Sequence, residues 1–333
     1  MGFETQDVES KVLAILNTLV DSREVIGSRI IAQRLKDRGV DLGERAVRYH
    51  LRLMDGKGLT QLVSRRDGRT ITELGRAELK KAMVTRKVGF ALSRIEILAF
   101  RTNFDVDKRT GSIPVNVSFF SKGDFNKALK AMQPIFRTGL CVSDLVAVAS
   151  EGEALGDLVV PAGKKGIATI CSIVANGTLL KAGVPMDSKF GGILQIRNHS
   201  PLRFVEIIHY EGSSLDPTEI FIRANMTSVA KAAEDGSGEI LANYREIPAI
   251  CRPLAEEVEA KLKDAGIRGI LLMGNVSEPV CEIPIELNQI GIVLIGGLNP
   301  VAAAAEAGII SESHAMSTVV DYRKLVKISE IGR

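Results

Sequence analysis

The chain has 333 residues, of which 45% are hydrophobic and 25% are charged, and its formal net charge is +3. This length predicts two or three domains, and this composition is that of a globular protein. No apolar run approaches the roughly 18 residues that a membrane span needs, and the first ten residues lack the pattern of a secretory signal. We therefore expect a cytoplasmic protein without a membrane partner.

Charge is distributed unevenly along the chain. Residues 1–90 contain 18 Lys and Arg against 12 Asp and Glu, a net charge of +6, whereas the remaining residues contain 25 against 28, a net charge of −3. A basic module followed by a mildly acidic body predicts a polyanionic partner for the first part only.

The basic module has the apolar spacing of three short helices, which we expect at residues 8–20, 28–39 and 43–56. On the third helix, His50 falls on the inward face and is expected in the core. The outward face carries Arg45, Arg48, Tyr49 and Arg52. Two helices, a tight turn and a third helix with a basic outer face are typical of the helix-turn-helix, whose last helix lies in the major groove of DNA.

A basic hairpin is expected directly after the third helix. Residues 59–63 are predicted to form a strand, and Asp67-Gly68 is a strong signal for a two-residue hairpin turn. The tip is expected to carry Arg65, Arg66 and Arg69. Guanidinium groups on a projecting loop suit contact with phosphates or the minor groove. Residues 1–85 therefore predict a winged helix-turn-helix that binds double-stranded DNA.

Residues 86–333 alternate β-rich runs with helical segments, which predicts a mixed α/β body, arranged as α+β. Strands are expected at 115–120, 145–148, 167–174, 191–196, 204–210, 270–273 and 292–295. Helices are expected at 124–132, 253–263 and 300–307, and residues 217–229 have a mixed pattern.

The body carries no strong catalytic signature. It lacks a P-loop, a dinucleotide-binding glycine motif, a zinc-protease motif and a serine-hydrolase motif. Cys141, Cys171, Cys251 and Cys281 have no paired spacing, so we expect buried free thiols, and the four histidines are too scattered for a metal site. Cys171 and His209 could form a nucleophile and base, but no third group supports them. We expect no metal and no catalytic cofactor.

Two glycine-rich segments are candidate anion sites. Residues 295–300 lead from a strand into a helix, where backbone N–H groups and the helix dipole favour an anion, although a tight turn capped by Asn299 explains the same residues. Residues 177–192 are predicted to be rich in loop and contain Lys181, with Arg203 following them. Such a segment suits a small dicarboxylate, or it is an exposed loop with solvated lysines.

The stretch from Leu42 to Leu74 resembles the DNA-reading module of the archaeal nitrogen repressor family, NrpR, and the body resembles the effector domain of that family. The resemblance of the body rests on four stretches, residues 166–185, 190–196, 203–221 and 295–309. With only one effector domain in the chain, the resemblance implies a homo-oligomer, dimeric or higher, or pairing with a second NrpR-type subunit.

The resemblance also implies a function: repression of nitrogen-assimilation genes from a palindromic operator, with 2-oxoglutarate as the effector that releases the DNA. From side-chain chemistry we expect the effector to contact Thr169, Cys171, Ser172, Lys181, Arg203, Gly296, Gly297 and Asn299. Two alternatives stay open. The body could be an enzyme, with Cys171 as nucleophile, whose expression the DNA-binding module autoregulates, or it could be a platform for a second regulatory protein.

Overall fold

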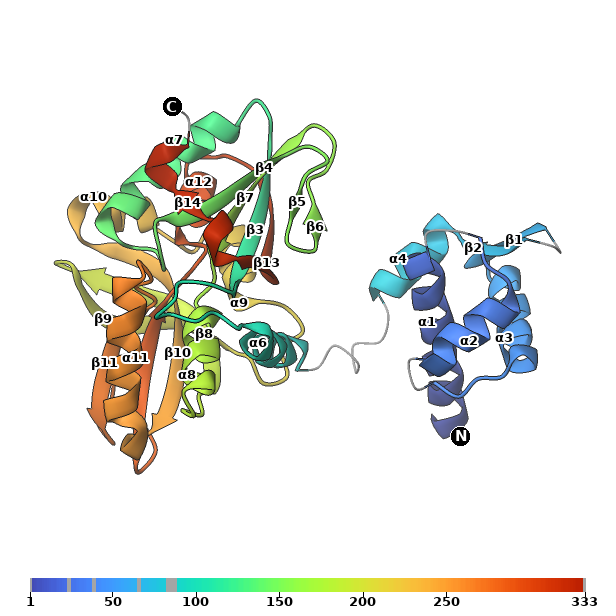
Figure 1. The fold of residues 1–333 in the computed structure, drawn as a ribbon, viewed down its shortest axis with the longest axis horizontal. Coiled ribbons are helices and arrows are strands. Elements are labelled where there is room, and N and C mark those ends of the chain that lie inside the picture. The colour runs from blue at the N-terminus through green and yellow to red at the C-terminus, as the bar shows by residue number, and fades with distance from the viewer. Residues whose placement is uncertain (1, 23–24, 38–39, 65–66, 82–88, 332–333) are drawn as a thin grey trace. The chain divides into compact units, whose positions relative to one another are not determined.

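The computed structural model describes residues 2–331, apart from 23–24, 38–39, 65–66 and 82–88. The chain divides into two compact units, Met1–Lys87 and Val88–Arg333. The elements of both units are labelled in Figure 1, and each unit has its own hydrophobic core. Among the described residues, none of the helices combines the length and apolar character needed to span a membrane.

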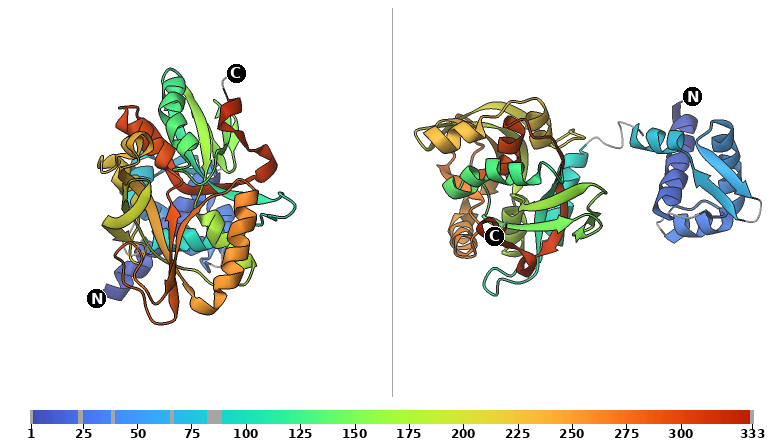
Figure 2. Two further views of the ribbon diagram at one scale, coloured as in Figure 1. Left: turned by 90° about the vertical axis from the view of Figure 1, so that its left-hand side faces the viewer. Right: turned by 90° about the horizontal axis from the view of Figure 1, so that it is seen from above.

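The first unit consists of helices and a two-stranded hairpin, whose strands lie to one side of the helices in the right-hand view of Figure 2. The elements are α1 (Gly2–Ser22), α2 (Ser28–Asp37), α3 (Glu44–Gly56), β1 (Thr60–Ser64), β2 (Gly68–Ile71) and α4 (Glu73–Lys81). Leu16, Ile31 and Val47, one from each of the first three helices, are 0% exposed and form the centre of the core. The predicted three helices and wing are thus confirmed.

The connection in the wing differs from the predicted two-residue turn. β1 ends at Ser64 and β2 begins at Gly68, which pairs with Ser64, so Gly68 belongs to the second strand. Gly68 has φ +115° and lies against the backbone of Ile26, where a Cβ would be 2.3 Å from the carbonyl oxygen. A glycine is needed here for this close approach, and not for the tip of the hairpin.

The strands of the body, in the part of the chain that is described, form two five-stranded sheets in which every pairing is antiparallel. The first sheet has the order β13-β3-β7-β4-β14, with bounds Ser311–Asp321, Ser112–Ser121, Lys164–Ile170, Leu145–Ser150 and Val326–Lys327. The second has the order β11-β12-β10-β8-β9, with bounds Ile270–Val276, Gln289–Ile295, Gly238–Pro248, Asp187–Arg197 and Ser200–His209. A small hairpin adds β5 (Ala154–Leu155) and β6 (Leu158–Val159).

Helices cover these sheets. They are α6 (Phe90–Arg101), α7 (Phe125–Thr138), α8 (Ile173–Lys181), α9 (Pro217–Arg223), α10 (Val229–Asp235), α11 (Arg252–Asp264) and α12 (Asn299–Glu306), with short 3₁₀ turns at Ala249–Cys251, Tyr322–Lys324 and Ile328–Glu330. α7 packs against α10 and α12, whereas α8 packs against α6 and α11. The antiparallel pairing makes the body α+β, as predicted.

Two predictions for the body are wrong in the region of α8. Residues 173 and 174 were expected to end a strand but begin α8, and residues 177–192 were expected to be rich in loop, but only residues 182–186 of them lie outside α8 and β8. Residues 173–179 of α8 are all buried. A helix that is buried on every side has no polar stripe, so its sequence lacks the helical period and resembles a buried strand. The helix α6 and the strands β10 and β13 were not predicted.

Candidate functional site

The third helix of the first unit carries the candidate nucleic-acid interface. Arg45, Arg48 and Arg52 are exposed, and Tyr49 is 61% exposed, whereas His50 is buried, as its inward position predicts. Arg48 donates from Nη2 to Glu44 Oε1 at 2.5 Å, one helical turn away. This pair is solvent-exposed on both sides, so it is readily exchanged for contact with an outside anion.

Arg69 does not stand at the tip of the wing as expected. It lies in β2, its Nε donates to Asp55 Oδ2 at 2.8 Å, and its side chain is only 16% exposed. Asp55 also accepts a hydrogen bond from Thr60 Oγ1 at 2.6 Å. Arg69 thereby ties the base of the wing to the last turn of α3. Arg65 and Arg66 lie outside the described residues.

Within the body, polar side chains surround a small buried cavity, which we call the inner cavity. It holds about 20 Å³ of free space. It is lined by Asn116, Cys171, Ser172, Ile173, Tyr210, Asp216, Thr218, Asn243, Arg245, Gly297, Leu298, Ala315 and Met316. These residues come from both sheets, from the starts of α8 and α9, and from the turn before α12.

The most unusual group in the inner cavity is the guanidinium of Arg245, which is 1% exposed. Its Nη1 donates to the carbonyl oxygen of Tyr244 at 3.0 Å and, more weakly, to that of Phe190 at 3.4 Å. Its Cζ lies 4.7 Å from the centre of the Tyr210 ring. Its Nε is buried without a hydrogen-bond partner in the described part of the chain. A buried cation with an unsatisfied donor is costly, so this site favours an anion.

A chain of hydrogen bonds crosses the inner cavity. Tyr210 Oη donates to Asn243 Oδ1 at 2.5 Å, and Asn243 Nδ2 donates to Ser172 Oγ at 3.1 Å. Burial raises the pKa of Tyr210 to about 12, so its hydroxyl stays a donor. Ser172 immediately precedes α8, and Gly297 lies just before α12. The positive ends of two helix dipoles therefore border the same cavity as Arg245.

Asp216 is the acidic group of the inner cavity. It is the N-cap of α9, where it accepts hydrogen bonds from the backbone N–H of Thr218 at 2.8 Å and of Glu219 at 3.3 Å, and from the Thr218 hydroxyl. Burial raises the pKa of its carboxyl above the ordinary value, and these hydrogen bonds oppose that rise. Its charge is thus partly neutralised by α9, which lessens its repulsion of an anion in the cavity.

Of the residues expected to contact the effector, Cys171, Ser172 and Gly297 line the inner cavity. A Cβ on Gly297 would lie 2.5 Å from the carbonyl oxygen of Ile170, so glycine is required by close backbone approach. Three others support this wall from behind: Thr169 Oγ1 donates to Gly297 O at 2.9 Å, Gly296 N donates to Leu241 O at 2.8 Å, and Asn299 bonds both backbone groups of Leu241.

The remaining two expectations, Lys181 and Arg203, are not brought to the inner cavity. Lys181 ends α8, eight residues from the end that borders the cavity, and its Nζ donates to the carbonyl oxygen of Phe100 at 3.1 Å. Arg203 is exposed on β9 and donates to Gln195 Oε1 at 3.2 Å. The loop expected to hold Lys181 is a helix, and a helix carries its last residue away from its first.

Sequence reasoning missed Arg245, Asp216, Asn243, Tyr210 and Asn116. For Arg245 and Asn243 the available signal was the run 238–248, in which an arginine follows five apolar or amide residues inside a predictable strand length. Cys171 is buried, and burial raises its pKa to about 11, whereas His209 is exposed on β9. The structure thus does not assemble the nucleophile–base pair. Cys141 is buried as expected, but Cys251 and Cys281 are only half-buried.

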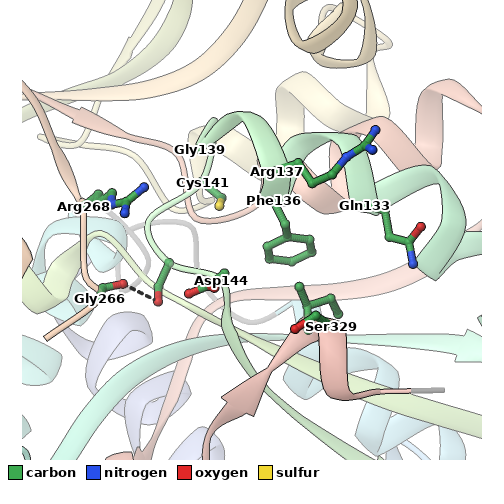
Figure 3. A pocket seen from close by; sticks show the side chains of 11 residues that line it. Gln133, Phe136, Arg137, Gly139, Cys141, Asp144, Gly266, Arg268 and Ser329 are labelled. Carbon is green, nitrogen blue, oxygen red and sulfur yellow. Dashed lines mark hydrogen bonds between the residues drawn. The ribbon is translucent and has the colours of Figure 1, made fainter. Parts of the chain in front are cut away.

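A second pocket, the outer hollow, lies on the surface of the body and has a volume of about 550 Å³ (Figure 3). The exposed side chains of Arg137 and Arg268 lie on opposite sides of it, with Phe136 between them and Asp144 below. It is large enough for a small ligand, but its cations are solvated and it borders the C-terminal ends of α7 and α11, which repel anions.

Both units match known protein families. Residues 88–327 match the model for the NrpR regulatory domains NRD1 and 2, and residues 13–79 match the model for the ribonuclease R winged-helix domain. The chain is similar to the crystal structure of a nitrogen repressor-like protein from Methanococcus jannaschii, with a TM-score of 0.61 and 30% identity, covering 72% of this chain and 98% of that one.

Whole-chain relatives agree with these matches. The chain is 38% identical over 321 residues to the global nitrogen regulator NrpRI of Methanosarcina mazei, covering 96% of this chain and 98% of that one. It is 31% identical to the global nitrogen regulator NrpR of Methanococcus maripaludis, covering 94% of this chain and 54% of that one, so it spans about half of that relative.

A winged helix with an exposed basic third helix, followed by a separate α+β body, defines a transcriptional regulator with a DNA-binding and a regulatory part. Among such regulators, this chain belongs to the NrpR family of global nitrogen regulators.

Proposed function

We propose that this protein represses nitrogen-assimilation genes by binding a palindromic double-stranded DNA operator as a homo-oligomer, and that 2-oxoglutarate bound in the inner cavity releases the DNA. The observation that carries the effector assignment is Arg245, a guanidinium that is 1% exposed and has a buried Nε without a hydrogen-bond partner in the described chain. A carboxylate is the natural complement of such a group, because it accepts two parallel hydrogen bonds from a guanidinium.

The rest of the inner cavity suits the second half of a dicarboxylate. The starts of α8 and α12 supply positive dipole ends for a second carboxylate, and the Ser172 hydroxyl and Asn243 amide are polar groups for a keto oxygen. Cys171 and Tyr210 stay protonated at neutral pH, because burial raises their pKa values to about 11 and 12. They add no negative charge to oppose the ligand.

DNA binding is assigned to the exposed face of α3, with Arg45, Arg48, Tyr49 and Arg52 as its contacts. The assignment is supported by the net charge of +6 on residues 1–90 against −3 on the rest of the chain. A palindromic operator requires two winged helices, and this chain has one, so at least two copies must assemble.

The experiment that tests this function is the binding of operator DNA at increasing 2-oxoglutarate, with glutamate as the control. A 100-fold loss of DNA affinity corresponds to a coupling free energy of about 2.7 kcal/mol, within the range that one or two charge-assisted hydrogen bonds supply. We expect release by 2-oxoglutarate and not by glutamate, because the ammonium group of glutamate takes the place of the keto oxygen and cannot accept a hydrogen bond from the Asn243 amide or the Ser172 hydroxyl. Undiminished DNA binding at millimolar 2-oxoglutarate would falsify the effector assignment.

A further inference from the structure

Helix α6 is the first element of the second unit, and it therefore follows the DNA-binding unit directly in the chain. It packs against α8 and β13 (Figure 1). Three segments that form walls of the inner cavity contact α6. They are the middle of β13, the loop before α9, and α8. α6 therefore contacts walls of the inner cavity and is also the element that follows the DNA-binding unit along the chain.

The strongest of the three contacts is made by Arg94. Its Nη2 donates to the carbonyl oxygens of Ala315 at 3.1 Å and of Met316 at 2.8 Å. Both residues line the inner cavity. They lie in a bulge of β13, where the register against β3 is broken between His314 and Thr318, and Met316 has φ +47°. The bulge is therefore a segment whose backbone is not held by strand pairing.

Side chains hold this bulge in place of a partner strand. Met316 N donates to Asn116 Oδ1 at 2.9 Å, and Ala315 N donates to Glu219 Oε1 at 2.7 Å. Asn116 itself lines the inner cavity. The bulge is thus bonded on one side to a cavity residue and on the other side to Arg94, so that a movement on one side is felt on the other.

The other two contacts reach the remaining walls. The backbone N–H of Ala91 donates to Ser213 O at 3.1 Å, in the loop between the cavity residues Tyr210 and Asp216. At the other end of α6, Thr102 lies so close to Gly177 of α8 that a Cβ on Gly177 would be 2.5 Å from Thr102 Cβ. α6 thus contacts segments of the cavity wall at Ala91 near its start, at Arg94, and at Thr102 just after its end.

The size of the inner cavity makes these contacts consequential. Its free space of about 20 Å³ is close to the room of one water molecule. A dicarboxylate of five carbons fits only if walls move apart, and the bulge of β13 and the loop before α9 are two walls that strand pairing does not hold. These are two of the walls to which α6 is bonded.

We propose that Arg94 couples the inner cavity to the DNA-binding unit: ligand entry displaces the β13 bulge, the Arg94 hydrogen bonds to Ala315 and Met316 are lost or re-formed, and α6 shifts at the point where the chain leaves for the DNA-binding unit. This inference rests on the proposed function. It meets the requirement that an effector must bind two arrangements with different affinity, because the arrangement with intact bonds excludes the ligand by size. Arg94 is a positioning residue in this scheme and does not touch the ligand.

The test uses the full chain with Arg94→Gln, with Arg94→Lys as the conservative variant and Arg101→Gln as the matched control. Arg101 lies on the same helix but pairs at the surface with Asp157, which does not line the inner cavity. For each protein, calorimetry measures 2-oxoglutarate binding, and fluorescence anisotropy measures DNA affinity with and without saturating 2-oxoglutarate.

We expect 2-oxoglutarate to bind all four proteins. A wild-type loss of DNA affinity of about 100-fold should persist in Arg101→Gln, fall below about 10-fold in Arg94→Gln, and be intermediate in Arg94→Lys, which reaches one carbonyl at a time. If 2-oxoglutarate releases the DNA equally from the wild type and from Arg94→Gln, the role of Arg94 is overturned while the proposed function stands. Loss of 2-oxoglutarate binding in both Arg94 variants would also overturn it, by making Arg94 part of the binding site. No release in the wild type would overturn the proposed function, and the coupling with it.

Discussion

Arginines occur in opposite settings in the two units. On α3 the guanidinium groups of Arg45, Arg48 and Arg52 are exposed to solvent, whereas Arg245 in the body is 1% exposed. An exposed guanidinium attracts any polyanion and is screened by salt. A buried one has lost its hydration, at a cost of several kcal/mol, and acts only on a group that enters its cavity. Burial, more than the number of charges, thus separates a surface for a DNA backbone from a site for one small anion.

The largest expected effect comes from removing the buried charge. We expect Arg245→Met to raise the free energy of unfolding by about 1–4 kcal/mol or leave it unchanged, because an apolar side chain of similar length avoids the desolvation of the guanidinium. Arg52→Met on the exposed face of α3 is the control and should change it by less than about 0.5 kcal/mol. Denaturant unfolding without ligand measures both. A loss of about 3–5 kcal/mol in Arg245→Met would instead make this guanidinium a structural group.

The second largest expected effect is a difference in how the affinities for DNA and for 2-oxoglutarate depend on salt concentration. Between about 50 and 200 mM salt, we expect DNA affinity to fall roughly 100-fold or more, because each phosphate that an arginine neutralises contributes a slope of about −0.9. The affinity for 2-oxoglutarate should change by less than about 3-fold, because a buried ion pair is little screened. Titrations of both ligands in the same buffers provide the comparison. Parallel salt slopes would mean that 2-oxoglutarate binds at an exposed surface.

A smaller effect distinguishes the arginines of the first unit from each other. Arg48→Ala should weaken binding to the best operator by about 1–3 kcal/mol and relax preference at one base position. Arg69→Ala should instead lower the free energy of unfolding of this unit by about 1–2 kcal/mol, since it breaks the partly buried bond to Asp55. Binding to a set of operator variants and thermal unfolding measure the two effects. The assignment fails for Arg69 if its variant unfolds like the wild type but binds DNA as weakly as Arg48→Ala.

The first unit could be predicted from its sequence nearly element by element, because its helices are amphipathic. α3, for example, buries Val47, His50 and Leu51 on one face and exposes arginines on the other. The body was less predictable for the same physical reason. α8 is buried on all sides, so its sequence carries no period that distinguishes a helix from a strand.

The candidate cavity was predicted only where local chemistry carries the signal. The Gly296-Gly297 turn is visible in the sequence, because close backbone approach requires glycine there. Arg245 gives only a weak signal, an arginine within a run of strand length, because its burial follows from the pairing of β10 between β8 and β12, which joins segments far apart in the sequence. Lys181 was wrongly predicted to contact the effector because it lies near Ser172 along the chain. α8 separates the two residues in space, since the helix rises with each residue from Ile173 to Lys181.

The most direct test of the account is calorimetric titration of the full chain with 2-oxoglutarate, comparing Arg245→Gln in the inner cavity with the double variant Arg137→Gln/Arg268→Gln in the outer hollow. Circular dichroism and the denaturant unfolding transition of each variant, compared with the wild type, verify that the body is folded, because the two units have separate cores. If 2-oxoglutarate binds in the inner cavity, Arg245→Gln weakens its binding at least 30-fold, corresponding to about 2 kcal/mol or more, and the double variant binds like the wild type. Unchanged binding in Arg245→Gln with loss in the double variant would contradict binding in the inner cavity and place the effector in the outer hollow.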